Sequence, residues 1–516
     1  MVTSYDRFTW QETTPGVWQR GVDEVEHFYF ALAKSFEGSG RMFFAITGHV
    51  SIHVDVPESD SWEQLDTRLD EALRKAWLTL RFYQPTIASH VAQDAGMMEP
   101  VKVYRTIRRD ADQRVWLESS LVLVSTGQTG IEWANADPVA PNLPTLFIIK
   151  PHPVNSGHNQ VIRRDLVLRS PHEIIDGIGT LQLLNNLIGH VSKAYAEGDR
   201  YRPPVLDGSE TSRLSPPFRV AANVPVTLNE TQQRRLAEMV MQKGAARQSD
   251  GDVAVLGVPF KQGAVLPGKH QRVAHTICEE QTSRLLTACK AIDATVTHAF
   301  HAAIAMVIRD VQERRPEASR IRYVSYILRN ERASCIEPYN TSEHAAAVYH
   351  SVSGKALVID MDDVAIGEAQ NSSRNEEYAH IIQSVKAFYE DVRNDQDHYA
   401  LASAIWARGI PSVPLPLSAA APLPVPPPKS LPSVSISSMG RVDSIIAPDQ
   451  GEIHVYNPWV TGEELSNGLG LFLGTYRGEM CLSAAYNDAW HTEDEVLDFL
   501  QRCVDVVFDG LSVSVV

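Results

Sequence analysis

A strand that runs directly into a histidine and then a helix is the feature that most constrains this chain. Residues 166–169 are an apolar, β-prone run closed by an arginine, Pro171 ends the run, and His172 follows at once. Asp176 and Gly177 then open a stretch with apolar residues at helical spacing. This order predicts a strand, a tight loop and a helix, which would hold the imidazole in one orientation. Because a general base needs a fixed imidazole, His172 is the first candidate catalytic residue.

The spacing His172-x-x-x-Asp176-Gly177 resembles the motif of the chloramphenicol-acetyltransferase-like superfamily. That superfamily includes acyl-CoA-dependent O-acyltransferases and the condensation domains of peptide synthetases. Many members carry two adjacent histidines, of which the second is the base, and here Pro171 stands at the first position. The resemblance implies an α/β fold of two similar lobes, each a mixed β-sheet with flanking helices. It also implies a channel between the lobes with the histidine at its middle.

Further segments extend the resemblance over most of the chain. They are a helix that ends in a proline at 84–85, an arginine-bearing turn at 329–332, a Ser-Ser-x-Gly-x-Val-Asp run at 437–443, and a last strand that ends at 487. The length, the Trp-rich opening and the run at 437–443 look most like the fungal acetyltransferases typified by trichothecene 15-O-acetyltransferase. The Asp-Phe-Gly-Trp-Gly motif of the plant branch is not present, so the plant branch is not favoured.

Strand and helix patterns occur in both halves of the chain. Strands are expected at 43–54 and 114–124 in the first half and at 321–328 in the second. Long helices are expected at 61–84, where leucines and Trp77 recur at helical spacing, and at about 374–393. This mixed order predicts an α/β protein.

The length of 516 residues suits two domains of roughly 200 to 300 residues each. Residues 199–225 are rich in proline, serine and arginine and lack periodicity, which is typical of a linker. We therefore expect an N-terminal lobe at 1–205, a linker at 206–225 and a C-terminal lobe at 226–516. The Pro-rich run at 411–432 is expected to be a surface loop of the C-terminal lobe.

Charge and composition bear on the partners. A net charge of −16 argues against a nucleic acid or an anionic membrane as partner, because both are bound by clustered Lys and Arg. No apolar run approaches the roughly 20 residues that cross a bilayer, and residues 1–10 do not resemble a secretory signal. We expect a cytoplasmic protein, acting as a monomer. The 5 cysteines form no C-x-x-C pair, and His298 and His301 have no third ligand nearby, so no metal is expected.

Two structural roles are open for Asp176. It could cap the helix that begins near Gly177. By resemblance to the superfamily, it could instead turn away from the channel and pair with an arginine, Arg332 being favoured over Arg329. Gly177 would let the backbone turn and approach its neighbours closely.

Transfer of an acyl group from a thioester to an alcohol needs a base, donors for the oxyanion and exclusion of water. His172 would supply the base. Ser437 or Ser438, in a strand that leads into a turn, could contact the oxyanion or the substrate. The alternative is that both serines only satisfy that turn.

Coenzyme A carries phosphates, which require local cations in so acidic a chain. One basic patch is expected in the loop at 261–272 and contains Lys261, Lys269, His270 and Arg272. A second would contain Lys429 and Arg441. Solvated surface charge is the alternative explanation for any one of these residues.

The sequence thus predicts an acyltransferase that acetylates a hydroxyl of a fungal secondary metabolite, such as a trichothecene or another terpenoid. Acetyl-CoA would be the co-substrate and His172 the general base. Two alternatives keep the fold: a carrier-protein-fed or amide-forming condensation enzyme, and a relative that binds or cyclises a metabolite without transfer. Neither a G-x-S-x-G elbow nor a phosphate loop is present, which disfavours a serine hydrolase and a nucleotide hydrolase.

Overall fold

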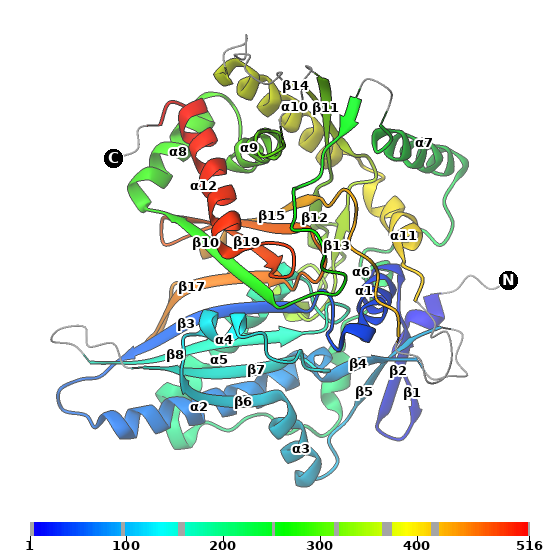
Figure 1. Cartoon of the computed structure of the whole chain (residues 1–516). Helices are drawn as coiled ribbons and strands as arrows, with labels where there is room; N and C mark the ends of the chain where they lie inside the picture. The colour runs from blue at the N-terminus through cyan, green and yellow to red at the C-terminus, as the bar shows by residue number, and fades with distance from the viewer. Residues whose placement is uncertain are drawn as a thin grey trace.

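A computed structural model describes residues 5–93, 99–152, 160–249, 253–313, 319–363, 374–413 and 423–513. Its helices and strands form two lobes, one below the other in Figure 1, and each lobe has helices packed on β-sheet. The lower, N-terminal lobe runs mostly from blue to cyan, and the upper, C-terminal lobe from green to red (Figure 1). The two-lobed α/β architecture expected from the sequence is confirmed.

The main sheet of the N-terminal lobe has the order β16-β17-β3-β8-β7-β6. Helices α2 and α5 cover it, and the apolar side chains of both helices join those of the strands in one core. In α2 the predicted stripe that includes Leu69, Leu73 and Trp77 is fully buried in that core. The bounds are β3 (Ile46–Asp55), α2 (Trp62–Tyr83), β6 (Leu121–Gly127), β7 (Thr145–Pro151), β8 (Val161–Ser170), α5 (Gly177–Glu197), β16 (Asp449–Gln450) and β17 (Ile453–Gly462).

A smaller sheet, of order β1-β2-β5-β4, precedes and flanks the main sheet. Helix α1, which follows β2, begins with a capping box between Asp23 and Glu26. Its apolar face packs against α11 of the other lobe, so α1 crosses the boundary between the lobes. The bounds are β1 (Gln11–Thr14), β2 (Val17–Gly21), α1 (Glu24–Ser35), β4 (Ser89–Ala92), β5 (Val101–Arg105), α3 (Asp110–Ser120) and α4 (Gly130–Asn135).

The C-terminal lobe is built on the sheets β10-β19-β18-β15 and β14-β11-β9, with a small β12-β13 pair. Helices α8, α9, α10 and α12 enclose a second large core, in which α9 is buried along almost its whole length. The bounds are α6 (Phe218–Ala221), α7 (Glu230–Ala246), β9 (Val253–Val255), β10 (His270–Ile277), α8 (Glu279–Ala291), α9 (Val296–Asp310), β11 (Ser319–Ser325), β12 (Leu328–Asn330), β13 (His350–Val352), β14 (Leu357–Asp363), α10 (Arg374–Asn394), α11 (His398–Gly409), β15 (Val434–Arg441), β18 (Leu469–Tyr476), β19 (Glu479–Asn487) and α12 (Glu493–Gly510).

Strand β17 ties the two lobes together. It comes from the C-terminal part of the chain but pairs antiparallel with β3, Gly462 lying opposite Ile46. The sequence pattern does not predict this strand, because Asn457 and Pro458 interrupt it. Asn457 has a φ of 47° and the register shifts between Tyr456 and Trp459, so a bulge accommodates the break. The predicted C-terminal lobe at 226–516 therefore supplies two strands to the N-terminal sheet.

The strand predicted at 114–124 is wrong for most of its length. Residues 114–120 are the second half of α3, and β6 begins only at Leu121. The Trp116 and Leu117 side chains face the core, and the Ser120 hydroxyl accepts a hydrogen bond from the Trp77 indole at 3.0 Å. Packing of residues 114–120 against the core has outweighed the β-prone composition of this run.

The other expected segments divide between described and undescribed residues. Residues 414–422 of the Pro-rich run lie outside the described residues, and 411–413 and 423–432 contain no helix or strand. The linker at 206–225 stays a prediction; it carries the short helix α6. Among the described helices none is by itself long and apolar enough to span a membrane, and only the bent pair of α8 and α9 reaches that length and composition.

Candidate active site

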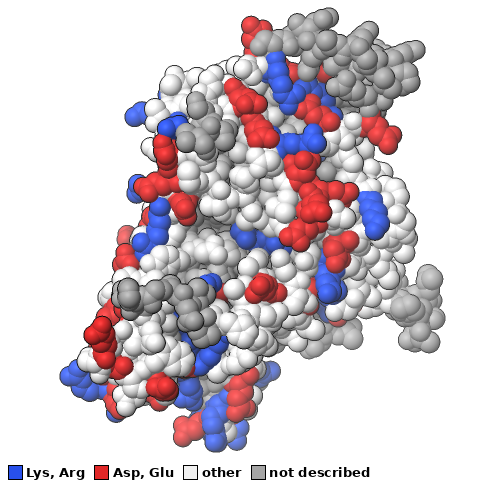
Figure 2. Space-filling view, turned by 60° about the vertical axis from the view of Figure 1, so that its left-hand side comes forward, with Lys and Arg blue, Asp and Glu red and all other residues white. Residues whose placement is uncertain are grey.

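His172 lies at the boundary of the lobes, on the wall of a cavity of about 640 Å³. The loop that carries it follows β8, as the sequence predicts. Phe44 and Asp176 line the cavity from the N-terminal lobe, and His350 and Ser437 line it from the C-terminal lobe. A space-filling view shows a hollow between the lobes on one face of the molecule (Figure 2). The cavity has the size of a small-molecule site, and its walls mix apolar and polar side chains.

Stacking fixes the imidazole ring of His172. The Tyr29 ring, on α1, lies 3.6 Å from it between centroids at an interplanar angle of 13°. Phe44 lies at 5.8 Å and 24°. The ring is only 6% exposed, and its Nδ1 atom is buried without a hydrogen-bond partner. The nitrogen available to a substrate in the cavity is therefore Nε2.

The surroundings keep His172 neutral. Burial, followed by the charge of His350 at a centroid distance of 5.6 Å, lowers the pKa of His172 to about 3. Burial disfavours the charged imidazolium, and a nearby cation disfavours it further. At neutral pH the ring is therefore uncharged and keeps a free lone pair.

Asp176 both caps α5 and pairs with Arg332, but it lines the cavity instead of turning away from it. Its Oδ1 accepts the N–H of Gly179 at 2.7 Å and so caps α5. Both carboxylate oxygens accept hydrogen bonds from Nη1 of Arg332, at 3.0 and 2.9 Å, and Oδ2 also accepts the N–H of Tyr349 at 2.7 Å. Burial alone would raise the pKa of Asp176, but Arg332 and then His350 hold it well below its ordinary value. The carboxylate thus stays ionised and joins the His172 loop to the C-terminal lobe.

Comparison with known proteins identifies the fold. No family model matches the sequence. In structure the chain is similar to the TRI3 trichothecene 15-O-acetyltransferase of Fusarium sporotrichioides, with a TM-score of 0.77, 18% identity, and coverage of 98% of this chain and 99% of that one. It is also similar to the first condensation domain of the CDA synthetase, with a TM-score of 0.58, 15% identity, and coverage of 98% and 97%. The chain therefore has the two-lobed fold of these acetyltransferase and condensation-domain structures.

Curated proteins that are similar to this chain in sequence are acetyltransferases. O-acetyltransferase pigM of Monascus ruber is 23% identical over 520 residues, 98% of this chain and 88% of that protein. Acetyltransferase pigO of the same organism is 22% identical over 503 residues, 96% of each chain. Trichothecene O-acetyltransferase TRI3 of Trichoderma arundinaceum is 23% identical over 259 residues, 47% of this chain and 48% of that protein. The expectation of an acetyltransferase is confirmed.

In this acetyltransferase Gly179, rather than Gly177, is the glycine that allows a close approach. A Cβ at Gly177 would meet only Val460, at ordinary contact distances of 3.7 and 3.8 Å. A Cβ at Gly179 would lie 2.2 Å from the Ala345 carbonyl oxygen and 2.7 Å from Nη2 of Arg332. The expectation for Gly177 is corrected accordingly, because Arg332 and the Ala345 carbonyl approach α5 at Gly179, two residues after the glycine of the motif.

The predicted serines both line the cavity. Ser437 is buried on β15, and the Ser438 hydroxyl accepts a hydrogen bond from the Thr297 hydroxyl at 2.8 Å or donates one to it. They belong to the C-terminal lobe, whereas His172 belongs to the N-terminal lobe, so the structure brings them to the same cavity from opposite sides. Contact of either serine with an oxyanion stays a prediction.

Of the cations predicted to bind coenzyme A, Lys429 lines this cavity and the others do not. Among the described residues that line it, Lys261, Lys269, Arg272 and Arg441 are not found. Arg272 is buried, with its guanidinium 4.5 Å from the Trp459 ring, and burial lowers its pKa.

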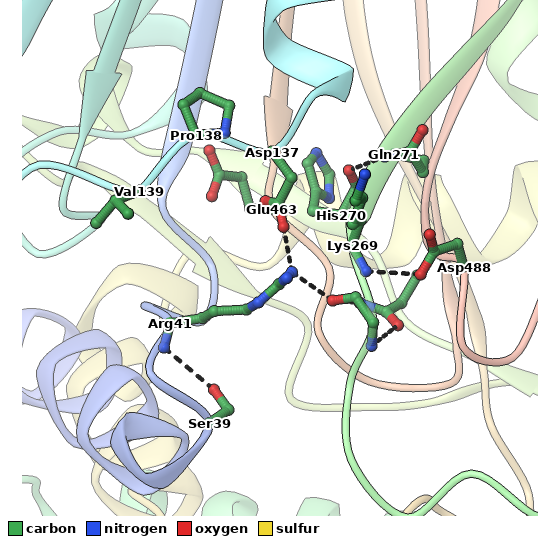
Figure 3. Close-up of polar contacts among 12 residues, drawn as sticks. Ser39, Arg41, Asp137, Pro138, Val139, Lys269, His270, Gln271, Glu463 and Asp488 are labelled. Carbon is green, nitrogen blue, oxygen red and sulfur yellow. Dashed lines mark hydrogen bonds and ion pairs between the residues drawn. The ribbon is translucent and has the colours of Figure 1, made fainter.

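The loop at 261–272 makes contact between the lobes instead. Figure 3 shows Arg41 reaching from the N-terminal lobe to Asp137 and to the Gly268 carbonyl, next to Lys269. The Lys269 N–H donates to Asp488 at 2.6 Å. Backbone contacts thus fix this loop at the boundary of the lobes, away from His172.

A buried ionic network contacts the His172 loop at the Glu173 carbonyl. No local pattern in the sequence predicts this network. Lys102, which is completely buried, donates to the Glu173 carbonyl at 2.7 Å and contacts Glu26. Arg20 binds both oxygens of Glu26 at 2.7 Å. Burial raises the pKa of Glu26, but Arg20 and Lys102 outweigh it and lower that pKa to about 2. The Glu173 side chain has no such partner: its Oε2 is buried without a hydrogen bond.

We expect Glu173→Gln to raise the free energy of unfolding, compared with the unmodified protein, by more at pH 8 than at pH 5. Burial raises the pKa of Glu173 from 4.5 to about 7. Between these values the unfolded chain loses the proton and the folded chain keeps it, so stability falls as the pH rises from about 4.5 to about 7. The glutamine has no such dependence. Urea unfolding at the two pH values should give a relative gain of up to about 3 kcal/mol for the variant. The exposed Glu58→Gln is the control, and an equal change in both variants would contradict the prediction.

Tyr29 and His350 are the site residues that sequence reasoning missed. The Tyr29 hydroxyl and Nε2 of His350 lie 2.8 Å apart, and Nδ1 of His350 lies 3.9 Å from Asp176. Neither residue belongs to a recognisable motif, and a histidine at the start of a short strand carries no signal of its own. Among the described residues no group of His, Cys, Asp and Glu is arranged to hold a metal ion.

Proposed function

We propose that this acetyltransferase is an acyl-CoA-dependent O-acyltransferase. It transfers the acetyl group of acetyl-CoA to a hydroxyl of a fungal secondary metabolite, a terpenoid such as a trichothecene. The observation that carries the proposal is the neutral, stacked imidazole of His172 on the wall of a cavity between the lobes. The named activities of the relatives support the reaction class.

The reaction needs one base and no acyl-enzyme. Nε2 of His172 accepts the hydroxyl proton as the acceptor oxygen attacks the thioester carbonyl carbon. The tetrahedral intermediate carries the negative charge on its oxygen, and the proposal assigns its stabilisation to a hydroxyl on β15, that of Ser437 or Ser438. The C–S bond then breaks, the imidazolium returns its proton to the leaving sulfur, and the products are the ester and coenzyme A. The low pKa of His172 favours this return, because the imidazolium is a strong acid in its buried position.

The cavity walls suit an apolar acceptor. Phe28, Leu32, Phe43 and Phe44 line one side and Met239 and Ile405 another. These side chains exclude water from the thioester, which would otherwise be hydrolysed. They also favour an acceptor with a large hydrocarbon surface.

The test is transfer from a labelled donor to a panel of acceptors. The purified protein is incubated with isotopically labelled acetyl-CoA and hydroxylated terpenoids, their keto forms and their amino analogues, and the products are read by mass spectrometry. We expect one added acetyl group on a hydroxylated acceptor, with release of one coenzyme A. Transfer only from an acetylated carrier protein, transfer only to amines, or binding of the acceptor without any transfer would each overturn the proposal.

A further inference from the structure

The wall of the cavity is basic, although the protein is strongly acidic. The chain has a net charge of −16, and Lys and Arg lie scattered among Asp and Glu over the face shown in Figure 2. The cavity inverts this balance: Asp176 and Glu464 are its carboxylates, and its cations are Lys243, Arg247, Arg329, Arg332, Arg408 and Lys429. A concave site with an excess of cations attracts an anionic ligand.

Some of these cations are already neutralised. Arg332 binds Asp176 as described above. Arg329 lies 3.3 Å from Glu331 and donates to the Val392 carbonyl at 3.2 Å. These two arginines therefore serve the structure and are not available to a ligand.

Lys243, Arg247, Arg408 and Lys429 form the remaining group, which we call the cationic rim. Among the described residues no carboxylate lies within ion-pair distance of any of the four. Arg408 donates only to a carbonyl of its own helix, at 3.1 Å. Glu464 is near enough to Lys429 for that lysine to lower its pKa, but burial outweighs this and raises the pKa of Glu464 overall.

Lys243 and Arg247 repel each other. They are four residues apart at the end of α7, where side chains on one face of a helix are neighbours. Lys243 is half-buried, and burial, followed by the charge of Arg247, lowers its pKa. An anion placed between the two side chains would offset this repulsion and favour the charged form of the lysine.

We propose that the cationic rim binds the phosphate groups of coenzyme A, which carries a pyrophosphate and a ribose phosphate. The inference rests on the proposed function and assigns the donor to one end of the cavity. The same cavity continues from the rim to His172, so a coenzyme held by its phosphates directs its thioester arm toward the imidazole. Arginine and lysine are the side chains that bind phosphate, arginine with two parallel hydrogen bonds.

The test compares two donors with the double variant Lys243→Gln, Arg247→Gln. S-acetylpantetheine has the reacting thioester but not the pyrophosphate and ribose phosphate of acetyl-CoA. We expect the KM for acetyl-CoA to rise by at least ~10-fold, because hydrogen bonds to charged groups are lost. The kcat with saturating acetyl-CoA, and kcat/KM with S-acetylpantetheine, should stay within about 2-fold of the unmodified protein. The KM effect should also shrink in high salt, which screens exposed charges.

The double variant Lys261→Gln, Lys269→Gln is the matched control. It removes the same charge from exposed positions outside the cavity. We expect no change in the KM for acetyl-CoA. An equal loss of kcat/KM with both donors in the rim variant would show a structural defect and would overturn phosphate binding by the rim. An equal loss of kcat/KM for acetyl-CoA in the rim and control variants would overturn it as well.

Calorimetric titration with coenzyme A and with pantetheine separates this inference from the proposed function. In one outcome the protein transfers no acetyl group but binds coenzyme A more tightly than pantetheine, and only the rim variant loses that difference in affinity. The proposed function is then wrong, and the rim as a phosphate site is supported. If transfer occurs and the rim variant binds coenzyme A unchanged, the rim alone fails. If the protein binds an acidic acyl carrier protein and no free coenzyme A, the coenzyme as ligand of the rim is overturned.

Discussion

Replacing His172 with alanine is expected to lower kcat for acetyl transfer by at least ~100-fold, with little change in the KM for acetyl-CoA. In the proposed reaction the imidazole contacts the acceptor proton and takes no part in holding the phosphates of the donor. The loss therefore falls on the chemical step rather than on binding of the donor. Steady-state kinetics with a hydroxylated acceptor, at saturating donor, measure it.

Two controls keep this prediction specific. His172→Asn preserves much of the size and polarity of the side chain while removing the base, and should lose as much activity as the alanine. His298→Ala removes a histidine that does not line the cavity and should leave kcat within about 2-fold. All three variants must unfold within a few degrees of the unmodified protein. If folded His172→Asn retains most of the activity, the imidazole is not the base.

The pH dependence of kcat/KM also follows from the His172 imidazole. Because the pKa of His172 is lowered to about 3, the base remains neutral from pH 8 to pH 5. An unperturbed imidazole would lose most of its activity across this range, since its pKa is about 6.5. Protonation of His172 should therefore produce no acid limb in kcat/KM above pH 5.

Replacing Arg332 with methionine is expected to lower the free energy of unfolding by about 3 to 5 kcal/mol. The change leaves the Asp176 carboxylate buried with its backbone donors but without its cation. The arginine side chain is 5% exposed and that of Asp176 is 3% exposed, so water cannot replace the lost partner. Urea unfolding followed by circular dichroism at pH 7 measures the loss.

Arg329→Met is the natural control for Arg332→Met. Arg329 was the alternative partner for Asp176, but its side chain is 28% exposed and faces Glu331. We expect a loss of less than about 1 kcal/mol, as for other partly exposed ion pairs. In the double variant Asp176→Asn, Arg332→Met, part of the stability should return, because no buried charge is left unpaired and asparagine still caps α5. Equal losses for the two arginine variants would contradict the assignment of Arg332.

The pH dependence of the free energy of unfolding tests the ion pair of Asp176 and Arg332 independently. The pKa of Asp176 is lowered in the folded protein, so its contribution is fully present above the ordinary pKa of 3.8 and is lost progressively as the pH falls below 3.8 toward the lower pKa of the folded state. Arg332→Met should remove this acid-sensitive part. The stability difference between the variant and the unmodified protein should therefore be smaller at pH 3 than at pH 7.

Local signals in the sequence predicted the elements that carry the motif. The strand before His172 and the helix after Asp176 depend on residues that are neighbours in sequence: an apolar run, a proline and a capping aspartate. The same is true of α2, whose buried stripe recurs every three or four residues. Such patterns depend on short-range geometry, which is why they also indicated the superfamily through residues 172–177.

Elements whose identity depends on distant contacts were not predicted. Strand β17 is broken by Asn457 and Pro458, and only its pairing with β3 makes it a strand. Residues 114–120 have strand-like composition, yet packing against α2 makes them a helix. The predicted basic loop at 261–272 is fixed by contacts between the lobes, which cannot be inferred from the charge of the loop alone.

The sequence by itself determined the α/β class, the strand, loop and helix around His172, and the aspartate that caps the helix. Only the tertiary structure decided that Tyr29 stacks on the imidazole, that Arg332 neutralises Asp176, and that the cationic rim lines the same cavity. The physical reason is the range of the interactions. Periodicity and capping act within a few residues of the chain, whereas stacking, ion pairing and cavity walls depend on which elements meet in space.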